Sequence, residues 1–304
     1  MAYRGLESLA FHNEAAIAGV LEWVPLIDAM ERAMTAFSAG EVEQPVRQMV
    51  PVPGHDAIIA AMPAVGEAMA VKIVTLYHDN AGTELPTHQA VIVVFDRDNG
   101  SPLAVLDGRL ITEMRTAAGS AAAARKLAVA KPAVVTIMGS GHQSRAHAAA
   151  LAAVRPVGEL RLWSRSPAAG QALAEELGAV FVAEAEAAVR DADIVATTTS
   201  ATTPILSGAW LKPGAFVSAV GWNGHDGREL DDAAMANTVL VESYAAARDQ
   251  AGNVRGSGCE VFAEIGEIYA GSKAVPAGAT VVYDSVGIAI MDVAAAKLAY
   301  DLLQ

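Results

Sequence analysis

A strand-like run in this chain leads directly into a glycine turn and then a helix, an order that few folds share. Residues 134–138 read Val-Val-Thr-Ile-Met, which is typical of a buried strand. The turn that follows consists of Gly139, Ser140, Gly141, His142, Gln143 and Ser144. The glycines permit a tight turn, and backbone amides at the start of a helix can bind a pyrophosphate. We therefore expect a dinucleotide site at residues 134–144, with an unrelated glycine turn as the alternative.

Strands and helices alternate along the chain from residue 132 onward, which indicates a doubly wound parallel sheet. The strand candidates are residues 134–138, 159–163, 179–182, 194–198, 215–220, 238–241 and 280–285, and helical stretches include 142–153 and 168–177. A last helix at 288–303 is expected to leave this domain and pack on the first one. The Rossmann domain should therefore comprise residues 115–287.

The first part of the chain has a different spacing of apolar residues. Helical spacing covers residues 14–38, and short Val- and Ile-rich runs at 46–52, 56–62, 68–76 and 89–96 predict a mainly antiparallel sheet. Asp98-Asn99-Gly100 reads as a hairpin turn. The predicted fold class is α/β, in which a Rossmann domain accompanies an α+β domain built from both chain ends, residues 1–114 and 288–304.

Composition excludes several classes of protein. A formal net charge of −13 argues against nucleic acid and anionic membrane as partners, since both need a clustered basic surface. Cys259 is the single cysteine, so neither an internal disulfide nor a typical zinc site can form, and we expect no metal. Residues 1–14 do not read as a signal peptide, and the sequence has no apolar run of roughly 18 residues, so we expect neither a secretory leader nor a membrane span. The expected location is the cytoplasm.

The end of the second Rossmann strand bears on cofactor choice. NAD-specific enzymes generally have an acidic residue here that binds the ribose hydroxyls, but this chain has Ser164, Arg165 and Ser166. A guanidinium between two hydroxyls suits a 2′-phosphate, so NADPH is favoured over NADH. Alternatively, Arg165 stacks on the adenine. Further candidate cofactor contacts, at or just after the next strand ends, are Thr198, Ser200 and Val220.

A set of motifs outside the glycine turn carries a family resemblance. They are Gln-Pro-Val-Arg at 44–47, Met-Pro-Ala at 62–64, Ala-Val-Lys-Ile-Val at 70–74, Leu-Pro-Thr-His-Gln at 85–89, Leu-Asp-Gly-Arg at 106–109, Arg-Thr-Ala-Ala at 115–118, Ala-Val-Gly at 219–221, Arg-Glu-Leu-Asp at 228–231 and Ser-Val-Gly-Ile-Ala at 285–289. Over nearly its whole length the chain resembles the ornithine cyclodeaminase/mu-crystallin family. The resemblance implies that the α+β domain binds substrate and forms a homodimer.

The resemblance also assigns roles to four residues. Lys72 lies in an apolar strand, an expensive place for an ammonium unless it is paired or functional. By resemblance it meets the substrate beside the nicotinamide, where it could exchange a proton with an imine nitrogen. Arg47 and Arg115 match the family's pair that binds the substrate carboxylate, and Thr116 should donate to the pyrophosphate. Alternatively, Lys72 lies at a sheet edge with its ammonium in solvent, and Arg47 is an exposed strand residue.

Departures from the family pattern affect the expected activity. Ornithine cyclodeaminases have an aspartate where this chain has Asn223, a candidate substrate ligand that cannot act as a base. Ornithine cyclisation is therefore doubtful. Other differences are at His78, in a turn, and at Asp284, where a lysine is common. The roles of these two residues and of His225 stay open.

The expected function is NAD(P)H-dependent reduction of the C=N bond of a 2-imino acid, such as the cyclic ketimine Δ1-pyrroline-2-carboxylate, to give L-proline. An acyclic imine formed from a 2-oxo acid and ammonia or an amine is the nearest alternative. Ornithine cyclodeaminase comes next. A non-catalytic protein that binds NADPH and a small ligand is the last.

Overall fold

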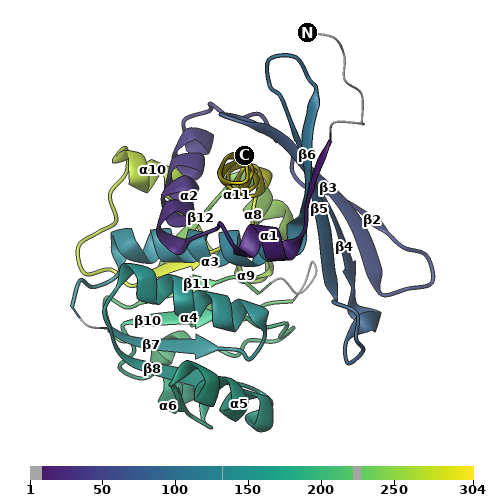
Figure 1. Cartoon of the computed structure of the whole chain (residues 1–304). Coiled ribbons are helices and arrows are strands. Elements are labelled where there is room, and N and C mark those ends of the chain that lie inside the picture. Colours follow the sequence, from purple (N-terminus) through teal and green to yellow (C-terminus); the bar gives the residue numbers. More distant parts are fainter. Residues whose placement is uncertain (1–8, 132, 222–226) are drawn as a thin grey trace. The chain divides into compact units, whose positions relative to one another are not determined.

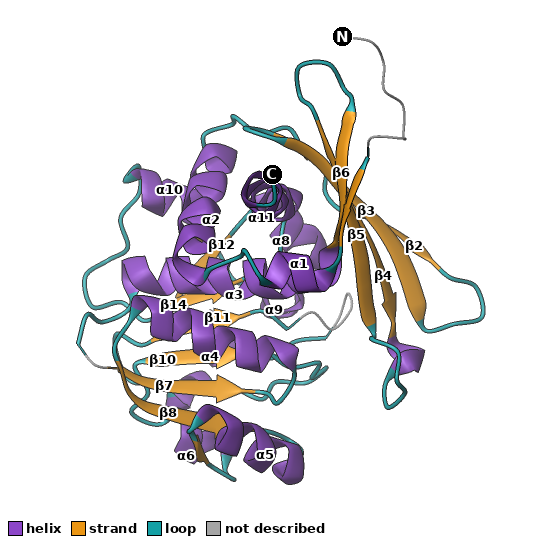
Figure 2. Ribbon diagram, in the orientation of Figure 1, coloured by secondary structure: helices purple, strands orange, loops and turns teal. Residues whose placement is uncertain are grey.

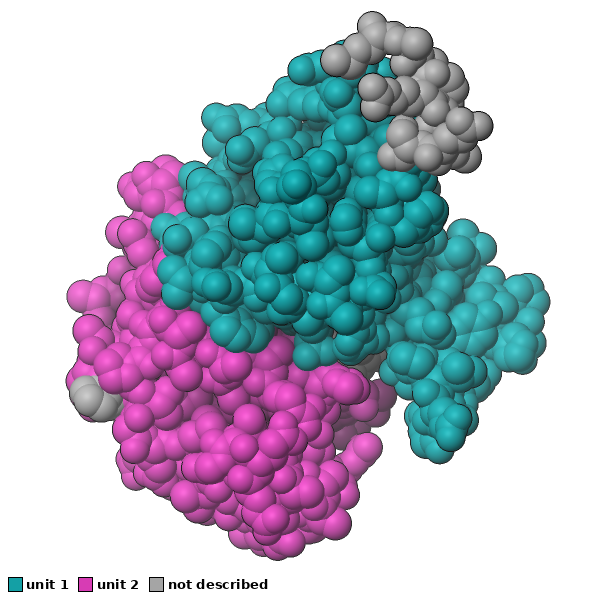
Figure 3. Space-filling model, in the orientation of Figure 1, with its two compact units in different colours: residues 1–115, 288–304 teal, residues 116–287 magenta. Residues whose placement is uncertain are grey.

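The computed structural model describes residues 9–131, 133–221 and 227–304. It divides into two compact units (Figure 3). Unit 1 comprises residues 1–115 and 288–304, and unit 2 comprises residues 116–287. Unit 1 is therefore built from both ends of the chain. The boundary falls within one long helix, α3 (Gly108–Leu127).

Unit 2 contains an eight-stranded sheet in the order β13-β12-β14-β11-β10-β7-β8-β9, and every neighbouring pair is parallel (Figure 1). The strands are β7 (Ala133–Met138), β8 (Val157–Trp163), β9 (Val180–Phe181), β10 (Ile194–Thr197), β11 (Phe216–Ala219), β12 (Thr238–Val241), β13 (Val261–Glu264) and β14 (Val281–Asp284). The helical segments between them are α4 (His142–Val154), α5 (Pro167–Leu177), α6 (Ala185–Val189), η3 (Gly208–Trp210), α7 (Asp232–Met235), α8 (Tyr244–Gln250), α9 (Gly252–Ser257) and α10 (Ile265–Ala270). This alternation confirms the doubly wound Rossmann prediction.

The strand order of unit 2 locates its ligand-binding edge. From β7 the chain passes outward to β8 and β9, and then returns to the other side of β7 to form β10. The carboxyl ends of β7 and β10 therefore flank the topological switch point, where doubly wound sheets bind their ligands. The central strands are buried on both faces, as expected of a parallel sheet covered by helices.

Unit 1 is built on a six-stranded sheet in the order β1-β6-β5-β4-β3-β2 (Figure 2). All neighbours are antiparallel except β1 and β6. Its strands are β1 (Ala10–His12), β2 (Gln48–Pro51), β3 (Ala57–Val65), β4 (Met69–Tyr77), β5 (His88–Phe95) and β6 (Pro102–Asp107). Its helical segments are α1 (Glu14–Ala18), α2 (Trp23–Ser38), η2 (His78–Asn80), the first part of α3, and α11 (Ala289–Leu302).

The two faces of the unit 1 sheet have different environments. Met62, Lys72 and Ile92 are in register on neighbouring strands, and all three are buried on the face that α11 contacts. Alternate residues such as Ile59 and Ile73 lie on the opposite face and are exposed. Helix α11 also contacts α2, which confirms that the last helix packs on the first domain.

The sequence did not predict every element. β1 has three residues and β13 has four, so neither is long enough to give a clear period-2 pattern. The hairpin turn at Gly100 is confirmed, because Gly100 has φ +77° between antiparallel β5 and β6. Within the described residues, no helix has both the length and the hydropathy needed to span a membrane.

Candidate active site

The glycine turn at the end of β7 is tightly packed. Gly139 has φ +142°, and a Cβ there would lie 2.5 Å from Thr198 Oγ1 and 2.8 Å from Ser144 Oγ. These two hydroxyls are themselves 2.8 Å apart, so they join the start of α4 to the end of β10. Only glycine fits this position. Ser144, at the third position of the fingerprint, therefore permits close packing as predicted and adds a hydrogen bond.

The start of α4 fits a pyrophosphate group. Gly141 is the N-cap residue and forms no side-chain cap, and His142 and Gln143 are the first two residues of the helix. No heavy atom lies within 4 Å of a Cβ built on Gly141, so a side chain there would extend into open space. An uncapped helix N-terminus beside such a space is suited to a phosphate anion.

The end of β8 presents polar groups next to this turn. Ser164 Oγ is 2.9 Å from Ser140 Oγ and accepts a hydrogen bond from the backbone amide of Ser166 at 3.2 Å. Ser164 is buried, whereas Arg165 and Ser166 are exposed. These contacts fix the backbone on both sides of Arg165, which lies on the surface of unit 2. None of residues 164–166 is acidic, so the end of β8 carries no carboxylate.

A buried carboxylate holds together the ends of β10 and β11. Glu229 accepts hydrogen bonds from Thr197 Oγ1, the amide and hydroxyl of Thr199, and the amide of Gly221, at 2.5–2.9 Å. Val220 is half-buried at this site and Ser200 is exposed. Burial raises the pKa of Glu229, while these donors oppose the rise.

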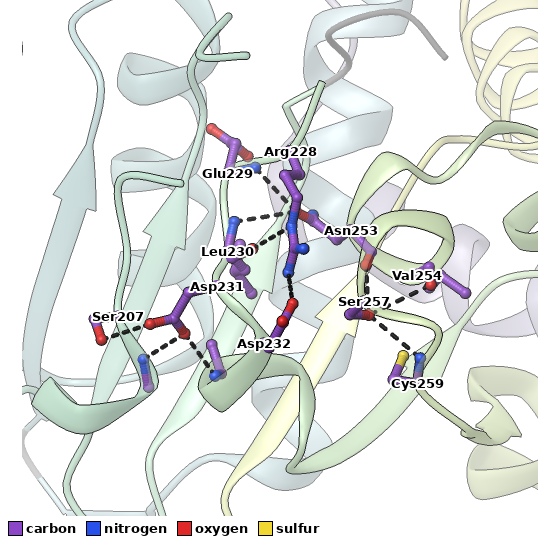
Figure 4. Close-up of polar contacts among 12 residues, drawn as sticks. Ser207, Arg228, Glu229, Leu230, Asp231, Asp232, Asn253, Val254, Ser257 and Cys259 are labelled. Carbon is purple, nitrogen blue, oxygen red and sulfur yellow. Dashed lines mark hydrogen bonds and ion pairs between the residues drawn. The ribbon is translucent and has the colours of Figure 1, made fainter. Parts of the chain in front are cut away.

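Asn253 fixes the segment that carries Glu229 (Figure 4). Its Oδ1 accepts from the amides of Glu229 and Leu230 at 2.9 and 3.0 Å, and its Nδ2 donates to Asp284 Oδ1 at 2.9 Å. Asp284 is buried, and this burial raises its pKa to about 7. At this position, where the family commonly has a lysine, the side chain is therefore part of the internal support of unit 2.

Lys72 occupies the centre of the unit 1 sheet. It lies on β4, which pairs with β3 on one side and β5 on the other, and its side chain is only 2% exposed. The alternative of a lysine at a sheet edge with its ammonium in solvent is therefore wrong. Its Nζ lies 3.4 Å from Thr112 Oγ1 of α3.

A carboxylate that the sequence did not predict binds Lys72. Asp292 of α11 is fully buried, and its Oδ1 accepts from Lys72 Nζ at 2.7 Å and from Arg115 Nε at 2.9 Å. Arg115 Nη1 contacts the sulfur of Met291 at 4.0 Å, and no oxygen of the described chain accepts a hydrogen bond from Nη1 or Nη2. The end of the guanidinium fork can therefore bind a carboxylate.

The electrostatics of this cluster are dominated by burial and by cations. Burial lowers the pKa of Lys72 to about 7, Asp292 opposes this shift, and Arg115 and Arg47 reinforce it. Arg47 is half-buried and directly precedes β2, so it is not an exposed strand residue. Burial and the Lys72 charge lower the pKa of His88 to about 4, which leaves its imidazole neutral near pH 7.

The other sequence-predicted residues have varied environments. Thr116 follows Arg115 on α3 and is buried. His78 is exposed in the η2 turn, as expected of a solvent-facing turn histidine. Asn223 and His225 lie outside the described residues. The structure thus gathers Lys72 and Arg115 in unit 1, with Arg47 near enough to affect the lysine, and gathers the glycine turn with Ser164 and Thr198 in unit 2.

Comparisons with known proteins give a consistent result. Residues 9–304 match the Ornithine cyclodeaminase/mu-crystallin family. The chain is 42% identical over 285 residues to the ketimine reductase mu-crystallin of Mus musculus and 34% identical over 296 residues to a Δ1-pyrroline-2-carboxylate reductase of Bacillus cereus, with 91% of both chains covered in each case. The structure of Thermococcus litoralis Δ1-pyrroline-2-carboxylate reductase with NADH and L-proline matches with a TM-score of 0.91, at 30% identity over 97% of both chains.

Proposed function

The chain belongs to the ornithine cyclodeaminase/mu-crystallin family, and from that premise we propose that it is an NAD(P)H-dependent reductase of the C=N bond of a 2-imino acid. The preferred substrate is the cyclic ketimine Δ1-pyrroline-2-carboxylate, and the product is L-proline. The observation that carries the proposal is the buried ammonium of Lys72 beside the Arg115 guanidinium, which gives one site a proton donor and a carboxylate ligand.

The substrate carboxylate is bound by arginine. Arg115 is held at Nε by Asp292, so its Nη1 and Nη2 are oriented as a fork for a planar anion. Arg47 adds a second positive charge close to the same cluster. Among the described residues, Lys72 and Arg115 share the one carboxylate of Asp292, and this excess of positive charge suits an anionic substrate despite the net charge of −13 for the whole chain.

The imine nitrogen receives its proton from Lys72. As the C=N bond is reduced, the carbon gains a hydride and the nitrogen gains a proton, which leaves an amine. A lysine whose pKa is lowered to about 7 is half protonated near neutral pH, where a general acid is most effective. In the oxidative direction the neutral amine of Lys72 accepts the same proton.

The cofactor is a nicotinamide dinucleotide bound by unit 2, and when bound it supplies the hydride. Gly139, Gly141 and the start of α4 fit its pyrophosphate, with Thr116 as a further donor. We favour NADPH, because Arg165 lies exposed at the end of β8, where an acidic residue would select NADH. The resemblance to an NADH complex keeps NADH as the alternative.

The active form is a homodimer. The face of the unit 1 sheet opposite Lys72 presents Phe11, Val50, Ile59 and Ile73, which are 75%, 59%, 41% and 38% exposed. Exposed apolar side chains on one sheet face are typical of a subunit interface. The proposed interface lies on the face opposite Lys72, so it does not involve the substrate-binding residues.

A substrate screen that follows NADPH absorbance tests the proposed function. Δ1-pyrroline-2-carboxylate is expected to be reduced faster than mixtures of 2-oxo acids with ammonia or an amine. Faster turnover of such a mixture would instead identify an acyclic imino acid reductase, and release of ammonia from L-ornithine would identify a cyclodeaminase. NADPH binding without turnover of any imine would contradict the proposal and favour a ligand-binding protein.

A further inference from the structure

Asp292 is an unusual residue for the helix that carries it. Helix α11 reads Ala-Ile-Met-Asp-Val-Ala-Ala-Ala from its first residue, and Asp292 is the one charged side chain in this stretch. It is fully buried. Burying a carboxylate is unfavourable unless cations and hydrogen bonds compensate for the lost hydration. The compensation comes from Lys72 on β4 and Arg115 on α3, so the carboxylate joins three elements of unit 1.

The way Asp292 uses its two oxygens points to a functional role. Both cationic nitrogens bind Oδ1, whereas Oδ2 is buried and accepts no hydrogen bond from the described chain. An ion pair that serves stability alone gains most when both oxygens bind donors, as in a bidentate pair with arginine. Here Oδ1 alone accepts from both the ammonium and the guanidinium, which holds the two cations next to each other.

The start of α11 is fixed in a way that sets the position of Asp292. The side-chain Oε1 of Gln44 accepts a hydrogen bond from the amide of Ile290 at 2.8 Å, in the first turn of the helix. Gln44 lies three residues before Arg47 in the chain. The segment that carries one proposed carboxylate ligand therefore also anchors the helix that orients the other.

We propose that Asp292 is a positioning residue of the reductase, which fixes Lys72 and Arg115 around one oxygen and keeps the lysine protonated for transfer to the imine nitrogen. This inference rests on the proposed function and deepens it.

The charges around Lys72 determine the direction in which its pKa would change without Asp292. The groups near it are Asp292 on α11, Arg115 and Thr112 on α3, Arg47 before β2, and His88 on β5. Burial and the two arginines lower the pKa of Lys72, Asp292 raises it, and His88 is neutral near pH 7. Loss of the Asp292 charge must therefore lower the pKa of Lys72 further.

The test compares the pH profile of kcat/KM for reduction of Δ1-pyrroline-2-carboxylate in three variants. In the profile of Asp292→Asn, the alkaline limb, where kcat/KM falls as pH rises, should move by about 1–3 pH units toward lower pH. This is the shift expected when a lysine loses an opposite charge at this distance. Asp292→Glu should keep the limb in place. Asp301→Asn is the matched control, because Asp301 is an exposed carboxylate on the same helix that pairs with Lys297. A uniform loss of rate in Asp292→Asn, with the limb unmoved, would overturn the inference.

NADPH titration and circular dichroism establish that each variant is folded. If Asp292→Asn does not fold, Asp292→Glu decides the question. Its extra methylene should displace Lys72 and lower kcat by about 10- to 100-fold, since an error of 1 Å can cost 10²-fold, while the limb stays where it was. An unchanged kcat in Asp292→Glu would contradict a positioning role.

Denaturant unfolding across pH 5–10 separates this inference from the proposed function, because it needs no turnover. Lys72 has a lower pKa in the folded than in the unfolded protein, so stability rises with pH between those two values. In Asp292→Asn the rise should begin at lower pH than in the unmodified protein. If the unmodified protein reduces no imine but shows this difference, the proposed function fails while the role of Asp292 in holding the Lys72 proton stands. An identical onset in both proteins would overturn that role.

Discussion

Replacing Lys72 by methionine is expected to remove most reductase activity without unfolding the protein. Methionine has a similar length but neither a charge nor a proton to donate. General acid–base groups contribute about 10²–10⁴-fold, so kcat/KM for Δ1-pyrroline-2-carboxylate should fall by that factor. NADPH should still bind, because the glycine turn and Arg165 belong to unit 2 whereas Lys72 belongs to unit 1.

The effect on stability follows from the net cost of burying the Lys72 ammonium. The pKa of Lys72 falls from 10.5 to about 7 in the fold, which corresponds to a cost on the order of 5 kcal/mol at neutral pH, since one pKa unit is about 1.4 kcal/mol. This cost already includes the attraction of Asp292. Lys72→Met removes the charge, so the free energy of unfolding at pH 7 should not fall and should rise by up to about 5 kcal/mol.

The sign of the pH dependence follows from the same shift. The folded pKa of Lys72 lies below its unfolded value, so the cost is fully present below about pH 7 and is relieved as pH rises toward 10.5. The unmodified protein should therefore gain stability relative to Lys72→Met as pH increases through this window. Lys297→Met is the matched control, since Lys297 is a partly exposed lysine of α11 that pairs with Asp301.

The assay combines urea unfolding at pH 6 to 10 with initial rates of NADPH oxidation. Lys297→Met should match the unmodified protein in rate and in the pH dependence of its stability. If Lys72→Met reduces cyclic and acyclic imines within a few-fold of the unmodified rate, the lysine is structural and the mechanism is wrong. A stability difference that does not change with pH would refute the assigned ionisation.

Three other predictions concern the cofactor, the carboxylate and the subunit interface. Arg165→Asp should reverse or abolish a preference for NADPH over NADH; equal affinities for the two cofactors in the unmodified protein, measured by titration, would refute the assignment. Arg115→Ala should raise KM strongly and also lower kcat, because the same contact binds the substrate and aligns it; initial-rate kinetics with KM unchanged would exclude it as a carboxylate ligand. Sedimentation should show a dimer at micromolar concentration, and Ile59→Asp should weaken it by placing a charge on the apolar sheet face; a monomeric unmodified protein would contradict the proposed interface.

The Rossmann fold could be predicted because its signals are local. A strand, a glycine turn and a helix follow one another within residues 133–154, and the structure adds the reason that Gly139 is required, since Thr198 and Ser144 occupy the space of a side chain. Lys72 could also be predicted as a constrained residue, because a charge in an apolar strand needs a partner.

The partner itself could not be predicted. Asp292 lies 177 residues from Arg115 in the chain, and its helix reads as an apolar packing helix. The one signal that could have indicated Asp292 is its charge within that apolar run, because such a charge, like that of Lys72, needs a partner. The roles of Asn253 and of Glu229, which belongs to the motif at 228–231, could not be predicted for a related reason. Single polar residues in short segments acquire their role only when the ends of β10, β11 and β14 come together.

Whether hydride is transferred from the cofactor to the substrate carbon tests the proposed reaction itself. The unmodified protein would be incubated with Δ1-pyrroline-2-carboxylate and NADPH deuterated at both C4 positions, and the product analysed by mass spectrometry and NMR. We expect one L-proline labelled at Cα for each NADPH consumed, and almost none with Lys72→Met over the same time. NADPH oxidation that leaves Cα of proline unlabelled, or no oxidation although NADPH binds, would contradict the proposed reaction.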